Sequence, residues 1–320
     1  MFLLAYNLAG YDSSHFYLYK ALAMFTGLSA FPLTPLNASG IDEKAFLNIL
    51  KRLTDAKVDS LGVLGSTGSY AYFTREQRKR IATLAVQHAD NIPVMVSIGA
   101  MSTDEVLRLA DDAQQAGASA LLLPALSYQK LSDEEVFGLY QDVTRQVSLP
   151  ICIYDNPGTT HVVFSDALHA RIATLPNIAS IKIPGVPADI AAAMQRVKSL
   201  RAQLPASVTI GVSGDAFAGP GLIAGCDLWY SVCGGLFPRT AKALADAAMT
   251  GDFAAVAAQA QRLDPLWALF TRHGGSLRVI AAAAGILGLT EMNCLPRPLR
   301  SLAAADVAEI QKVIAKLDLA

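Results

Sequence analysis

The sequence predicts an α/β protein: a (β/α)8 TIM barrel followed by a C-terminal helical extension. From Gly27 onward, short apolar or β-branched runs alternate with longer amphipathic segments, which is the pattern of repeated strand–helix units. Eight such runs occur before residue 235, and none follows it. Because eight parallel strand–helix units close a barrel, the count favours a barrel over an open sheet.

The predicted strands are apolar along their whole length, as expected for strands that are buried on both faces. In chain order they are GLSAFPLT (27–34), SLGVLGS (60–66), PVMVSIG (93–99), ALLLPA (120–125), PICIYD (150–155), IASIKIP (178–184), SVTIGVSG (207–214) and DLWYSVCG (227–234). Amphipathic segments such as 42–56 and 74–90 follow them as predicted helices. Ser132 and Ser165 each precede acidic residues, which is typical of a helix start.

The chain divides into three predicted parts. Residues 1–23 are expected to be an N-terminal extension, because Met24 would start the folded part and residues 1–23 lack the basic region of a signal peptide. Residues 24–250 form the predicted barrel. Residues 251–320 form a predicted helical region, in which alanine-rich segments are broken at Gly251-Asp252 and at the glycines 274–275.

Composition restricts the classes of partner. The 26 Lys and Arg residues nearly balance the 27 Asp and Glu residues, so no basic field is available for nucleic acid or an anionic membrane. No uncharged apolar run reaches the ~18 residues of a membrane span. The four cysteines lack zinc or redox spacing and the five histidines stand singly, so no metal site is predicted. We therefore expect a cytoplasmic protein that acts on a small molecule.

The ends of the predicted strands are the place to look for a site, because in such a barrel they meet at one mouth. Lys182 lies within an apolar strand, where an ammonium group is costly unless it is solvated, paired or neutralised. If the site is dry, burial lowers the lysine pKa and leaves a free amine that can attack a carbonyl and form a Schiff base. The alternative is a strand-end lysine that reaches out to solvent.

Two further features fit a Schiff-base site. Tyr154 ends the strand before that of Lys182, so the two would be neighbours, and its phenol could act as a general acid and base. A 2-oxo acid bound to Lys182 must also place its carboxylate, and Gly65-Ser66-Thr67-Gly68 offers hydroxyl and backbone N–H groups for it. Each feature has an ordinary alternative: a half-buried strand tyrosine, and a plain strand-to-helix turn.

The motifs MFTGLSAFPLTPLN, GSTG, YDNP, IKIP and VSGD, in this order, resemble those of the dihydrodipicolinate synthase and N-acetylneuraminate lyase family. The resemblance covers the chain from about Met24 onward. It implies a barrel with C-terminal helices, a homotetramer, pyruvate or another 2-oxo acid as substrate, and no cofactor beyond the lysine. It also makes Lys182 the Schiff-base residue and Tyr154 the general acid and base.

The resemblance assigns other residues to the site. Ser66 and Thr67 would bind the substrate carboxylate, and Ser66 would take part in the proton relay. Tyr128 aligns with the tyrosine that family members lend to a neighbouring subunit's relay. Ser213 and Gly214, at the end of the seventh strand, and Thr159, after the fifth strand, complete the predicted substrate-binding set.

Departures from the family pattern concern the second substrate. Thr159 stands where the biosynthetic synthases carry an arginine that binds the aldehyde's carboxylate, and a threonine hydroxyl does not replace that charged fork. The nearest basic group in the sequence is His161. Ala216 and Phe217 stand where sialic-acid lyases have acidic residues for sugar hydroxyls. Neither familiar specificity is therefore predicted.

The sequence thus predicts a carbon–carbon or carbon–oxygen lyase that forms a Schiff base at Lys182. Three alternatives stay open. The chain could be a genuine dihydrodipicolinate (4-hydroxy-tetrahydrodipicolinate) synthase, or a barrel that binds a 2-oxo acid without turnover. It could also be a sugar-phosphate enzyme, with a phosphate cup formed by GVSGD and CGGLFP after the last two strands.

Overall fold

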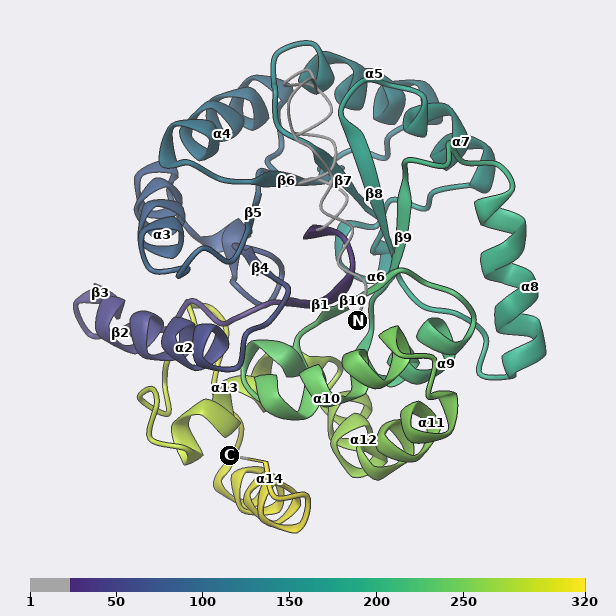
Figure 1. The fold of residues 1–320 in the computed structure, drawn as a ribbon. Coiled ribbons are helices and arrows are strands. Elements are labelled where there is room, and N and C mark those ends of the chain that lie inside the picture. Colours follow the sequence, from purple (N-terminus) through teal and green to yellow (C-terminus); the bar gives the residue numbers. More distant parts are fainter. Residues whose placement is uncertain (1–23, 320) are drawn as a thin grey trace, which may run out of the picture.

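The fold is a closed barrel of eight parallel strands with helices around it (Figure 1). The structure, a computed structural model, describes residues 24–319, so the expectation for residues 1–23 lies outside the described part. Around the barrel the order is β1, β4, β5, β6, β7, β8, β9 and β10, which pairs with β1. Their bounds are Gly27–Ala30, Ser60–Val63, Val94–Ser97, Ala120–Pro124, Ile151–Tyr154, Ile178–Ile183, Thr209–Val212 and Leu228–Ser231. The predicted (β/α)8 barrel is confirmed.

Each of the eight predicted apolar runs contains one barrel strand. A small antiparallel pair, β2 (Leu36–Asn37) and β3 (Gly40–Ile41), lies between β1 and the first outer helix. The sequence did not predict this pair, because two-residue strands carry no measurable periodicity.

The outer layer consists of the helices that follow the strands. They are α2 (Glu43–Asp55), α3 (Arg75–Gln87), α4 (Thr103–Ala116), α5 (Asp133–Thr144), α7 (Asp166–Ala173), α8 (Ile190–Arg201), α9 (Ala218–Ile223) and α10 (Pro238–Met249). The predicted caps form: the side chains of Ser132 and Ser165 accept hydrogen bonds from the backbone N–H groups of Glu135 and Leu168. Helix α3 ends at Gln87, before the predicted residue 90, because the backbone already leaves the helical conformation at His88 (φ −116°, ψ 15°).

The strands separate two apolar regions. The larger one fills the space between the strands and the outer helices, and the smaller one fills the barrel interior. The interior set comprises Met24, Phe25, Phe31, Met95, Ala120, Leu122, Cys152, Tyr154, Leu228 and Tyr230. Because these side chains occupy the barrel axis, a ligand can enter only above them, at the carboxyl ends of the strands.

The C-terminal region packs beside α10 and reaches the mouth of the barrel (Figure 1). It contains α11 (Phe253–Arg262), α12 (Asp264–Arg272), α13 (Ser276–Ile286) and α14 (Ala304–Lys316). Helix α12 contacts the short 3-10 helix η2 (Asp215–Phe217), which follows β9. The predicted helical extension is therefore present, and it borders the site. Within residues 24–319, no helix has the length and apolar character needed to cross a membrane.

Candidate active site

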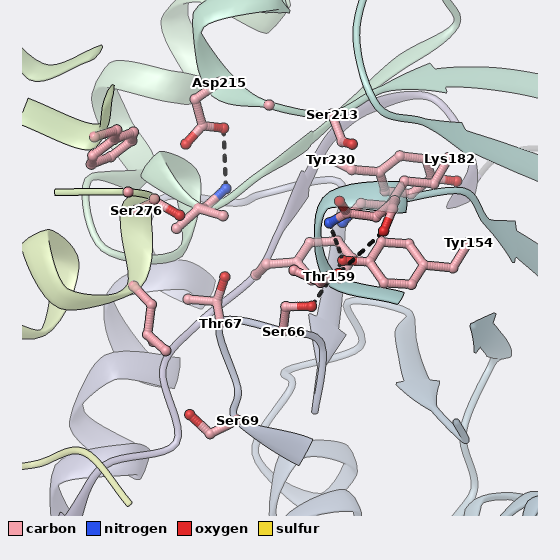
Figure 2. Close-up of a pocket in the computed structure, with 18 of the residues that line it drawn as sticks. Ser66, Thr67, Ser69, Tyr154, Thr159, Lys182, Ser213, Asp215, Tyr230 and Ser276 are labelled. Atoms are coloured by element: carbon pink, nitrogen blue, oxygen red, sulfur yellow. Dashed lines mark hydrogen bonds between the residues drawn. The ribbon is translucent and has the colours of Figure 1, made fainter. Parts of the chain in front are cut away.

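A cavity of about 700 Å³ lies at the carboxyl ends of the barrel strands (Figure 2). It brings together residues that lie on β7 and β8 or follow β4, β7 and β9 and are far apart in the chain. Seven of the eight predicted site residues line it: Ser66, Thr67, Tyr154, Thr159, Lys182, Ser213 and Gly214. The exception is Tyr128, which is 92% exposed and does not line the cavity of its own chain.

Lys182 lies on β8, directly beside Tyr154 of β7 in the strand register. Its side chain is buried, with 6% exposure, and does not reach out to solvent. The amine nitrogen lies 3.8 Å from the centre of the Phe31 ring and 5.5 Å from that of Tyr230. Burial lowers the pKa of Lys182 below its ordinary value, and the nearby Tyr154, Cys152 and Asp215 oppose that shift only in part. The amine is therefore free to a greater extent than in an exposed lysine.

The Tyr154 hydroxyl has two hydrogen-bond partners in the cavity. The Asn156 amide nitrogen donates to the phenol oxygen at 2.8 Å, and Ser66 Oγ lies 2.9 Å from the same oxygen. The phenol oxygen that accepts from Asn156 still carries its own proton, so a proton can pass between the Tyr154 and Ser66 hydroxyls in either direction. Asn156 belongs to the YDNP motif, but the sequence analysis assigned no role to it, because the direction of its side chain depends on the turn after β7.

The GSTG turn requires both of its glycines. A Cβ on Gly68 would lie 2.9 Å from the Leu64 backbone, and a Cβ on Gly65 would lie 2.7 Å from the Phe31 ring. This tight turn holds Thr67 at the cavity, where it is buried and its hydroxyl has no partner among residues 24–319. The hydroxyl is therefore available to an anionic ligand.

The loop after β9 contributes Ser213, Gly214 and Asp215. Ser213 donates its hydroxyl proton to the Ile183 carbonyl at 2.7 Å, which leaves its oxygen able to accept. Gly214 has a φ of 75°, and a Cβ there would lie 2.9 Å from the Pro184 carbonyl oxygen. These contacts fix the loop against the end of β8.

Asp215, which the sequence analysis did not assign, is buried beneath this loop. Its carboxyl accepts hydrogen bonds from the Trp229 indole and from the backbone N–H groups of Val232 and Cys233 (3.0, 3.2 and 2.7 Å). Burial raises its pKa to about 6, although these hydrogen bonds oppose the shift. A phosphate cup after β10 (Leu228–Ser231) would use the same N–H groups, so the carboxyl argues against the sugar-phosphate alternative.

The outer side of the cavity comes from the C-terminal helices, which the sequence analysis did not connect with the site. In Figure 2, Ser276 lies across from Lys182 and Tyr154. The lining residues from this region are Trp267, Phe270, Thr271, Gly274, Gly275, Ser276, Leu277 and Arg278. No local pattern could have indicated them, because their position depends on how α12 and α13 pack on the barrel.

A model of the Dihydrodipicolinate synthetase family matches residues 24–317, which is nearly the whole chain. The chain belongs to the dihydrodipicolinate synthetase family. Membership confirms the resemblance carried by the five motifs and the predicted enzyme class, a lyase.

Similar proteins cover most of the chain. The 4-hydroxy-tetrahydrodipicolinate synthase of Rhodospirillum centenum is 31% identical over 267 residues, which are 83% of this chain and 89% of the relative. The solved dihydrodipicolinate synthase of Agrobacterium tumefaciens is 42% identical, with a TM-score of 0.88 over 93% of this chain and 99% of that chain. The enzyme of Thermotoga maritima is 26% identical, with a TM-score of 0.86 over 93% of this chain and 100% of that chain. The family fold therefore includes the C-terminal helices.

Proposed function

We propose that the protein is a class I lyase that binds pyruvate or another 2-oxo acid as a Schiff base on Lys182. The observation that carries the proposal is the burial of the Lys182 amine among aromatic rings, beside the hydrogen-bonded Tyr154 hydroxyl. An amine with a lowered pKa is the nucleophile that Schiff-base chemistry needs.

The reaction begins with the substrate carboxylate on the hydroxyl and backbone groups of Ser66 and Thr67. The Lys182 amine attacks the keto carbon, and the resulting carbinolamine loses water to give an iminium ion. Loss of a proton from the neighbouring carbon gives an enamine, which forms a carbon–carbon bond with an electrophile. Tyr154 moves the protons to and from the substrate oxygens, and Ser66 is the next group in its relay.

The remaining predicted residues have roles at the edges of the site. Ser213, Gly214 and Thr159 border the space for the second substrate. The exposed ring of Tyr128 is suited to contact a second subunit, in agreement with the homotetramer that the family resemblance implies. All four cysteines, Cys152, Cys226, Cys233 and Cys294, are free and buried, which supports a cytoplasmic location.

A second candidate function is 4-hydroxy-tetrahydrodipicolinate synthase itself, because that is the name of the Rhodospirillum centenum relative. Thr159 argues against it. The residue lines the cavity and donates its hydroxyl to the Asn156 carbonyl at 3.4 Å, so it offers no positive charge to an aldehyde's carboxylate. Membership in a family of lyases argues against the other alternative, a barrel that binds without turnover.

Borohydride reduction in the presence of pyruvate tests the proposal. We expect one pyruvate-derived mass per chain, located on Lys182 by peptide mapping, and no such mass in Lys182→Ala. Lys198→Ala is the matched control, because Lys198 is exposed on α8 and does not line the cavity. A label that persists in folded Lys182→Ala, or that maps to another lysine, would overturn the assignment.

A further inference from the structure

The outer wall of the cavity combines an apolar surface with one charge. Its apolar side chains are those of Trp267 and Phe270 on α12 and Leu277 on α13. Phe217, in the loop after β9, also lines the cavity. Arg278, in the first turn of α13, is the charged residue among them. No role for this wall follows from the Schiff-base steps, which take place at Lys182.

Arg278 has an unbalanced charge. It is half-buried, and within residues 24–319 its guanidinium group makes no hydrogen bond or ion pair. The first turn of α13 contains no acidic residue that could neutralise it. By contrast, Arg272 at the end of α12 pairs with Glu309 and Asp306.

The other charged groups of the cavity do not balance Arg278 either. Only Lys182 and Asp215 accompany it among the described residues that line the cavity. Lys182 contributes no negative charge, and the Asp215 carboxyl is occupied by three N–H groups beneath the loop. A half-buried guanidinium group without an anion is suited to bind one from solution.

We propose that Arg278 determines specificity for the second substrate, and that this substrate is an aldehyde with a carboxylate at the far end of an apolar segment. The proposal rests on the Schiff-base function above and assigns its electrophile. The Arg278 fork binds the carboxylate in two parallel hydrogen bonds, and the side chains of Trp267, Phe270 and Leu277 cover the apolar segment. Arg278 thus supplies, from α13, the positive charge that Thr159 lacks.

The step that uses this substrate is an aldol addition. The enamine carbon on Lys182 bonds to the aldehyde carbon, and the aldehyde oxygen takes a proton from Tyr154 and becomes a hydroxyl. Water then hydrolyses the iminium ion, which releases the 4-hydroxy-2-oxo acid and regenerates the Lys182 amine. In the reverse direction the same atoms give pyruvate and the aldehyde.

The test compares two aldehydes with the same apolar body, 4-carboxybenzaldehyde and benzaldehyde, each with pyruvate. We expect the wild-type protein to prefer the acid, and Arg278→Leu to lose ~10- to 150-fold in kcat/KM for the acid, the range for a charged hydrogen bond. The loss should appear mainly as a higher KM for the acid, and kcat/KM for benzaldehyde should change less than threefold. Arg278→Lys should recover part of the preference, since it restores the charge without the fork.

Arg300→Leu is the matched control, because it removes the same charge from an exposed C-terminal position outside the cavity. Affinity is measured separately, by titrating each aldehyde into the borohydride-reduced pyruvyl enzyme, on which no turnover occurs. The inference is overturned if neither measurement shows a preference for the acid, or if Arg278→Leu weakens both aldehydes equally.

Pyruvate trapping separates this inference from the function on which it rests. If wild-type protein and Arg278→Leu both trap pyruvate on Lys182 but have the same kcat/KM for 4-carboxybenzaldehyde, only the role of Arg278 is wrong. If the wild-type protein does not trap pyruvate, the Schiff-base function fails, and the assignment of its electrophile fails with it.

Discussion

Replacing Tyr154 with phenylalanine removes one oxygen atom from the centre of the site. Tyr154 is buried in the barrel interior, so the ring of Tyr154→Phe keeps its packing. The change deletes two hydrogen bonds, one to Ser66 and one from Asn156. At ~0.5–1.5 kcal/mol each, their loss lowers the free energy of unfolding by ~1–3 kcal/mol. A protein with an ordinary stability of ~5–15 kcal/mol stays folded after that loss.

The expected effect on the reaction is larger. A positioned general acid and base contributes ~10²- to 10⁴-fold, which corresponds to ~2.7–5.4 kcal/mol in the barrier. Because the change in the barrier acts on the reaction rate and the change in stability acts on the melting temperature, the two effects can be measured separately. We expect Tyr154→Phe to slow proton exchange by at least ~10²-fold while its melting temperature falls by only a few degrees.

The assay requires no second substrate. Exchange of the pyruvate methyl protons with deuterated water, followed by NMR, reports formation of the enamine, and borohydride trapping reports the Schiff base. Tyr140→Phe is the matched control: Tyr140 is fully buried and donates its hydroxyl to the Leu123 carbonyl at 2.5 Å, but it does not line the cavity. Tyr140→Phe should lower the melting temperature and leave the rate of proton exchange unchanged. If Tyr154→Phe exchanges protons within threefold of the wild-type rate, the proposed relay is refuted.

Three further predictions concern other positions. Because burial lowers the pKa of Lys182, the unfolded chain binds more protons than the folded one at pH values between the lowered folded pKa and the unfolded pKa of ~10.4, so the wild-type protein loses stability as pH falls through this range. Lys182→Met should therefore melt higher than the wild type near neutral pH, with a difference that narrows toward pH 10; a difference independent of pH would contradict this. Thr159→Arg should raise condensation of pyruvate with aspartate semialdehyde ~10- to 150-fold above a weak wild-type rate, whereas wild-type kcat/KM above ~10⁴ M⁻¹s⁻¹ would show the inference from Thr159 to be wrong. Tyr128→Phe should slow proton exchange at least tenfold. Mixed oligomers of Tyr128→Phe and Lys182→Ala subunits should regain part of the exchange rate, because an intact Tyr128 from one subunit then reaches an intact Lys182 in another. If mixing restores no exchange, Tyr128 has no role in a neighbouring subunit's site.

The barrel could be predicted from the sequence because its signal is local. Each strand is a continuous apolar run, and each run lies between turn residues and an amphipathic segment. The helix starts were equally readable, since Ser132 and Ser165 bind their own first turns. The end of α3 was missed because the backbone leaves the helix at His88, where the sequence has neither a glycine nor a proline to mark the end.

The site was predictable to the extent that its residues end strands. Tyr154 and Lys182 could be placed side by side because consecutive strands of such a barrel are neighbours. Asn156 and Asp215 were missed, although both lie within two residues of positions that were assigned. Their side chains contribute through contacts with Tyr154 and with the backbone after β10, and such contacts are not visible in a strand pattern.

The specificity for the second substrate could not be predicted from the sequence motifs alone. The absence of a positive charge at Thr159 suggested a site without a carboxylate-binding arginine, and His161, the nearest basic residue in the sequence, does not line the cavity. The walls of the cavity come from several elements, however, and Arg278 lines the same space from α13. Because the reacting groups stand on the barrel strands while the opposite wall stands on helices that pack against them, the electrophile can change without any change at Lys182 or Tyr154. For this chain, specificity therefore has to be derived from the packing of α12 and α13 on the barrel rather than from the motif around Tyr154.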